Sequence, residues 1–132
     1  MRFSALLATA GVVSILFGAL FLLAPATGLV QYGVSTDATG LFMSQFFGAA
    51  LLQMGLILYL ARRVQDPATI RAIALGGMVG EILGLSVAVR IQMAGMVNSF
   101  GWSTVLIYGL FALAFARFAF GGPVTAEGAQ PG

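Results

Sequence analysis

Glu81 is the side chain best suited to chemistry in this sequence, because it interrupts an apolar stretch, ALGGMVGEILGLSVAVR (74–90), with a carboxylate. It is one of only four acidic residues in a chain of 132. If this stretch crosses a bilayer, Glu81 lies near the centre, where an ionised carboxylate costs on the order of 3 kcal/mol. A carboxylate at that depth needs a partner and is expected to face the protein interior.

Three other polar side chains fall at the depth of Glu81 when the apolar stretches of the chain are aligned at their midpoints. They are Ser14, Gln53 and Tyr108, each within about one helical turn, ~5 Å, of the centre. Such a layer either satisfies its own hydrogen bonds and fixes the register of the helices, or it binds a proton, a cation or the polar head of a lipid-like molecule such as a quinone. The sequence leaves both interpretations open.

The residue types on which most other sites depend are absent. The sequence contains no Cys, no His and no Lys, which excludes thiolate chemistry, the commonest metal ligand and Schiff-base catalysis. The net charge is only +2 and the arginines form no basic patch, so binding to nucleic acid is not expected. We therefore predict a protein that is not an enzyme, with no catalytic residue, no metal site and no cofactor.

The composition identifies the elements that must position these side chains. Hydrophobic residues make up 60% of the chain and charged residues only 8%, against about 25% charged residues in a soluble domain. Because a bilayer core takes about 20 apolar residues per helix, we predict an all-α integral membrane four-helix bundle with transmembrane spans at about 4–24, 41–61, 71–90 and 101–120. Asp66-Pro67 and Asn98-Ser99 are expected to begin the helices that follow them. The polar residues 121–132 are predicted to form a disordered tail.

The arginines predict the orientation of this bundle. Five of the six fall at the N-terminus, in the second loop and near the C-terminus, namely Arg2, Arg62, Arg63, Arg71 and Arg117. Only Arg90 falls on the other side. This bias predicts that both termini are cytoplasmic, in a multi-pass protein of the bacterial inner membrane.

The first apolar stretch has an alternative interpretation as a signal peptide. Arg2 is followed by a hydrophobic run that ends at Ala24-Pro25-Ala26, a weak cleavage site. The run is about 20 residues long, however, whereas the apolar region of a signal peptide has 7–15 residues. We therefore expect the first span to be retained.

Small residues are spaced four apart in all four spans, in pairs in the second (Ser44 and Gly48) and fourth (Ala112 and Ala116) and in runs of three in the other two. Gly76, Gly80 and Gly84 form two overlapping GxxxG motifs in the third span, and Ala10, Ser14 and Gly18 have the same spacing in the first. Small residues allow helix backbones to approach closely inside a membrane. These residues are expected either to pack the four helices together or to present a face to a second protein.

The layout of the chain resembles that of small four-helix bacterial membrane proteins of the DoxX-like type. The resemblance rests on a first span that ends in Leu23-Ala24-Pro25, the stretch FFGAALLQMGLILYLARR (46–63), a short loop rich in Arg, Asp and Pro, and an aromatic-rich last span. The DoxX family has an Arg early in its first helix and a later Lys partner. Only Arg2 corresponds to that pair, so no redox or thiol-related role is carried over.

These features predict one function, described first below, and leave one alternative open. The first is a structural or accessory membrane subunit that associates through its small-residue faces with itself, as a homo-oligomer, or with subunits of a larger complex. The alternative is a small proton-coupled carrier or a binder of a lipid-like or quinone-like molecule that uses Glu81 at the bilayer midplane. Apart from lipids, the expected partners are therefore other membrane subunits or a lipid-like small molecule.

Overall fold

Helices joined by short loops make up the residues that the computed structural model of the protein describes, 1–122. The helices are α1 (Phe3–Leu23), α2 (Pro25–Gln31), α3 (Ala38–Ala61), α4 (Pro67–Met93) and α5 (Gly101–Phe120). The predictions of an all-α chain and of four helices long and apolar enough to cross a membrane are confirmed, and the observed ends differ from the predicted ones by at most four residues. Of the tail predicted to be disordered, residues 123–132 lie outside the described residues.

Short polar side chains begin two of the long helices. The Asp37 carboxylate accepts a hydrogen bond from the Gly40 amide at the start of α3. At the start of α4, the Asp66 carboxylate accepts hydrogen bonds from the Thr69 hydroxyl and from the Thr69 amide. These bonds, the one from the hydroxyl first, lower the pKa of Asp66 from its ordinary value. Both caps satisfy amides that have no partner within a helix.

The prediction that Asn98-Ser99 caps the start of α5 is wrong. The residue that precedes the helix is Phe100, and no side chain caps the first turn. The Asn98 side chain instead accepts a hydrogen bond from the Phe100 amide and donates one to the carbonyl of Gln31. Asn98 is used to join distant parts of the chain, which local sequence does not reveal.

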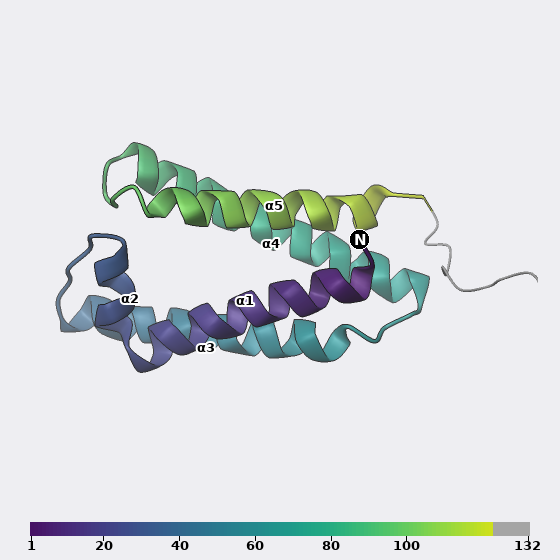
Figure 1. The fold of residues 1–132 in the computed structure, drawn as a ribbon, viewed down its shortest axis with the longest axis horizontal. Helices are drawn as coiled ribbons and strands as arrows, with labels where there is room; N and C mark the ends of the chain where they lie inside the picture. Colours follow the sequence, from purple (N-terminus) through teal and green to yellow (C-terminus); the bar gives the residue numbers. More distant parts are fainter. Residues whose placement is uncertain (123–132) are drawn as a thin grey trace, which may run out of the picture.

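The long helices form two antiparallel pairs, α1 with α3 and α4 with α5 (Figure 1). Glycines bring the first pair into backbone contact: Gly11 faces Gly55, and Gly18 faces Gly48. A Cβ atom on Gly18 would lie 2.5 Å from the Leu52 amide nitrogen, and one on Gly11 would lie 2.9 Å from the Gly55 carbonyl oxygen. The glycines within each helix are seven residues apart, so they share one face.

The second pair also uses glycines seven residues apart, but here each glycine receives an aromatic ring. Phe115 of α5 packs on Gly77 and Tyr108 packs on Gly84. Gly76 and Gly80 have no atom within 4 Å of the position of an added Cβ. Of the small-residue runs predicted in the first and third spans, Ala10, Gly18 and Gly84 therefore lie in helix contacts. The third-span GxxxG motifs do not form one packed face.

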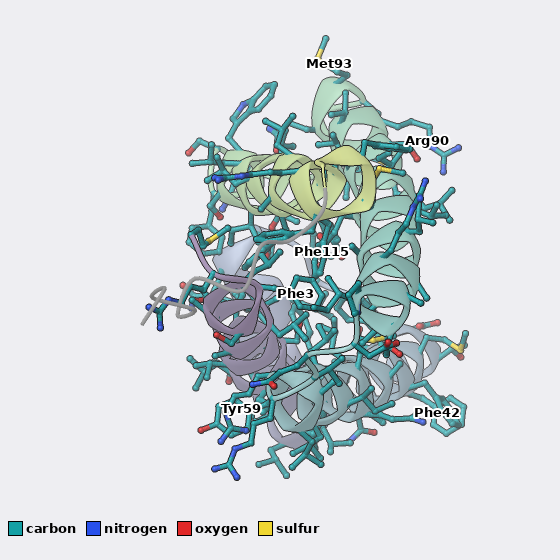
Figure 2. All side chains as sticks on the ribbon, turned by 90° about the vertical axis from the view of Figure 1, so that its right-hand side faces the viewer. Phe3, Phe42, Tyr59, Arg90, Met93 and Phe115 are labelled. Carbon is teal, nitrogen blue, oxygen red and sulfur yellow. The ribbon has the colours of Figure 1, made fainter. Side chains whose placement is uncertain are left out.

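The buried core fills one end of the molecule. It is built from Phe3, Leu6, Leu7, Ala10, Leu58, Ile70, Ala74, Phe115 and Ala119, which come from all four long helices. Figure 2 shows Phe3 and Phe115 in the middle of the molecule, between the helices. Arg2, Arg62, Arg63, Arg71 and Arg117 lie near the helix ends on this side, which we call the arginine end. The opposite end holds α2 and is called the α2 end (Figure 1).

The outer surface of the helices is apolar. Leu23, Leu60 and Leu113 are 80%, 72% and 72% exposed, and none of the buried residues within 1–122 is polar or charged. Arg90 is exposed and points away from the molecule (Figure 2). An apolar exterior over four helices of this length is typical of proteins that have lipid as their solvent.

Candidate functional site

A small set of polar contacts joins the two helix pairs at the α2 end. The Tyr32 hydroxyl and the Thr104 hydroxyl form a hydrogen bond of 2.8 Å. The backbone N–H of Asn98 donates a hydrogen bond to the Tyr32 carbonyl at 2.9 Å. The Asn98 side chain reaches the Gln31 carbonyl at 3.0 Å, and the rings of Tyr32 and Phe100 lie 5.1 Å apart. We call Gln31, Tyr32, Asn98, Phe100 and Thr104 the α2 bridge. It ties α2 to α5 and to the loop before it.

A cavity of about 550 Å³ lies between the core and the α2 bridge. On α1 the core ends at Ala10 and the cavity begins at Val13, and on α5 the cavity ends at Phe111 and the core begins at Phe115. Its wall is formed by Val13, Ser14, Phe17, Phe21, Leu29, Tyr32, Val34, Met43, Ser44, Phe47, Leu51, Glu81, Ile91, Met96, Val97, Thr104, Ile107, Tyr108 and Phe111. The core therefore occupies the arginine end of the helix bundle, and this cavity lies nearer the α2 end.

The cavity reaches the surface of the molecule near the start of α3. Met43, Phe47 and Met96 line it and are nevertheless 60%, 45% and 66% exposed. The helix pairs are α1 with α3 and α4 with α5, and α3 and α4 do not pack along each other. The opening is therefore bordered by apolar side chains at a place where two consecutive helices are not in close contact.

Glu81 of α4 lines this cavity. Its side chain is half-buried. Within residues 1–122, its carboxylate makes no hydrogen bond and no ion pair. Ser14 of α1 and Tyr108 of α5 line the same cavity. Tyr108 rests on Gly84, which is three residues after Glu81 and so about one turn away on α4. Ser14, Glu81 and Tyr108 thus line one cavity.

Gln53 is separate from the other three residues of the predicted layer. Its side chain is exposed on α3 and does not line the cavity. The reason is helical phase: Gly55 faces α1, and a residue two positions away on an α-helix is turned by about 200° from it. Counting residues from the span midpoint fixed the depth of Gln53 but not the side of the helix on which it lies.

Hydroxyl groups near the α2 end of the cavity were not among the predicted site residues. Ser44 and the Tyr32–Thr104 pair line the wall. The Ser44 hydroxyl donates to the Gly40 carbonyl of its own helix at 2.8 Å, so its donor is already used. Tyr32 and Thr104 are 72 positions apart in the chain, and no local pattern signals that they meet.

The charge distribution in the site is simple. Glu81 carries the one carboxyl group in the cavity wall, and none of the six arginines lines the cavity. Within residues 1–122, His, Cys, Asp and Glu form no group of three that is suited to a metal ion. The site can therefore offer one carboxyl group and a few hydroxyls inside an otherwise apolar wall.

Comparison with known proteins adds nothing to this description. No family model, no curated protein and no solved structure matches the chain. The resemblance to DoxX-like proteins therefore stays a prediction.

Proposed function

We propose that this chain is a non-enzymatic integral membrane protein that binds a lipid-like small molecule between its two helix pairs, with Glu81 as the polar contact. The observation that carries the proposal is the cavity of about 550 Å³ that Glu81 helps to line. Its volume lies within the 300–1,000 Å³ that is usual for small-molecule sites, and its wall is apolar with a few polar groups, as in such sites. An ionisable group inside a membrane bundle is by default a functional residue.

The proposed location is the bacterial inner membrane, with both termini in the cytoplasm. Four helices of sufficient length and an apolar exterior support insertion. The five arginines at the arginine end support the orientation, because Lys and Arg accumulate in short cytoplasmic loops. The bacterial assignment follows from the DoxX-like resemblance of the layout.

A structural or accessory subunit is the second candidate function. Gly76 and Gly80 support it, because they lie on α4 with no atom within 4 Å of an added Cβ. A helix of another subunit, or of a second copy, approaches such a surface more closely than it approaches a surface of large side chains. This candidate assigns no role to the cavity.

Native mass spectrometry of the gently extracted full-length protein tests the proposal. The wild-type protein is expected to retain a non-protein mass. The variant Ile107→Trp, which fills the cavity, is expected to lose that mass. The matched control is Leu106→Trp, because Leu106 is the preceding residue and is 61% exposed.

Two results contradict the proposal. Equal retention by both tryptophan variants places the bound molecule outside the cavity. Co-extraction with other polypeptides and no small molecule in any variant favours the accessory subunit instead.

A further inference from the structure

The cavity wall contains one carboxyl group and no positively charged side chain. Glu81 lines it, while Arg2, Arg62, Arg63, Arg71 and Arg117 are at the arginine end and Arg90 points away from the molecule. An uncompensated carboxylate in a low-dielectric site is unfavourable until a positive group approaches it. Either a proton or a positively charged ligand can neutralise this carboxylate, and a positively charged ligand is the one that would bind in the cavity.

Hydroxyl groups are already supplied by the chain itself. Ser14 and Tyr108 line the wall with Glu81, so a neutral alcohol would bring a group that the cavity already possesses. An anionic head, such as a fatty-acid carboxylate or a phosphate, would meet a carboxyl group with no arginine beside it. The wall thus favours a positive head over a neutral one and a neutral head over a negative one.

An inorganic cation does not fit the same wall. Hard cations require about six oxygen ligands, whereas most of the side chains that line this cavity are Val, Leu, Ile, Met and Phe. An organic cation needs only one counter-charge and a few acceptors for its N–H groups, and its hydrocarbon part gains from contact with apolar side chains.

From these residues we infer that the ligand is an amphiphilic amine whose ammonium group binds the Glu81 carboxylate and whose hydrocarbon part lies toward the α2 end of the cavity. Tyr108 and Ser14 lie beside the head as acceptors for its remaining N–H groups. The tail passes between Phe17, Phe47 and Ile107. This inference rests on the proposed function, because it specifies the chemistry of the molecule in the same cavity.

The test compares three probes that share the same hydrocarbon tail and differ in their polar head: dodecylammonium, dodecanol and dodecanoate. Each radiolabelled probe is titrated into the full-length protein in phosphatidylcholine nanodiscs, which carry no net charge. Nanodiscs with the Ile107→Trp variant supply the background of partition into lipid. Wild-type protein is expected to bind dodecylammonium about ten-fold or more tightly than dodecanol, and Glu81→Gln is expected to abolish this preference without weakening the binding of dodecanol.

Each alternative outcome overturns a different statement. Equal binding of dodecylammonium and dodecanol, or a preference for dodecanoate, overturns the amine while leaving the cavity as a ligand site. Binding of all three probes at the background level of Ile107→Trp overturns the proposed function and the inference with it. The preference among heads is measured in wild-type protein, so the result does not depend on the folding of Glu81→Gln.

Discussion

At the scale of single residues, Glu81 combines a stability cost with a binding role. The carboxylate has no hydrogen-bond partner among residues 1–122, and it lies beside Ser14 and Tyr108 in an apolar cavity. Leaving a half-buried carboxyl group without a partner costs up to about 1–3 kcal/mol. We therefore predict that Glu81→Leu stabilises the ligand-free protein by about that amount and abolishes ligand binding. Residues kept at a cost in stability are characteristic of functional sites.

Thermal unfolding in detergent, measured for wild type and variant without added ligand, checks this prediction. Gln53→Leu is the matched control, because Gln53 has the same predicted depth but is exposed on α3. It removes a polar group without entering the cavity, so ligand binding is expected to be unchanged. If Glu81→Leu instead lowers the unfolding temperature by several degrees, Glu81 has a structural partner and the self-satisfied layer is the better interpretation.

The same residues show what the sequence can and cannot predict about the site. Ser14, Glu81 and Tyr108 were placed together because residue counts along apolar spans measure depth, and they do line one cavity. Gln53 has the right depth and the wrong face. Which side of a helix faces the interior depends on its partner helix, and apolar residues surround these helices on all sides, so the sequence carries little directional signal.

At the scale of helices, two kinds of glycine have opposite roles. Gly18 is in backbone contact with α3, whereas Gly80 has open space around it. A methyl group at Gly18 would lie 2.5 Å from a backbone nitrogen, so Gly18→Ala forces α1 away from α3 and is predicted to cost about 1–3 kcal/mol. Gly80→Ala meets no neighbour and is predicted to stabilise by about 0.5–1 kcal/mol, because alanine favours the helix.

The two alanine variants are compared by thermal unfolding of the purified protein. They form a matched pair, since each adds one methyl group to a long helix. A loss of stability in Gly80→Ala, accompanied by loss of an oligomer or of a co-purified subunit, contradicts an open surface at Gly80 and identifies it as part of an interface. A neutral Gly18→Ala contradicts the close approach of α1 and α3.

The helix boundaries were largely predictable and α2 was not. Pro25, Asp37 and Asp66 are local signals, because they act on the backbone within one turn. The residues of α2 include Pro, Thr and Gly, which are typical of a turn. The helix is instead supported by tertiary contacts: Gly28 packs against the ring of Phe21, and α2 rests on α1 and α3. Short helices of this kind depend on packing rather than on propensity.

At the scale of the whole molecule, two rigid pairs are joined firmly at one end and lightly at the other. The core joins them through buried side chains from four helices, whereas the α2 bridge uses a few hydrogen bonds and one aromatic contact. Each of these hydrogen bonds contributes about 0.5–1.5 kcal/mol. The pairs are therefore expected to separate first at the α2 end, where the cavity lies.

Distances between spin labels test whether the α2 bridge controls this separation. The chain has no Cys, so Phe42→Cys and Met93→Cys introduce the only thiols, at positions that are 56% and 73% exposed. Figure 2 shows Phe42 and Met93 on the rim of the molecule, on different helix pairs. We predict that Tyr32→Ala broadens the distance distribution and shifts it to longer values, and that Tyr32→Phe, which keeps the ring beside Phe100, does so less.

The control for this prediction keeps both labels on one helix pair. Labels at Leu23→Cys and Phe42→Cys report on α1 and α3, whose glycine contact does not involve the α2 bridge, so Tyr32→Ala should leave their distance unchanged. Broadening in both label pairs means that Tyr32 supports the fold as a whole. No broadening in either means that the core alone holds the pairs together. If the distance distribution broadens only between labels on different helix pairs, and dodecylammonium reverses the broadening, then occupancy of the cavity controls how far apart the two helix pairs lie.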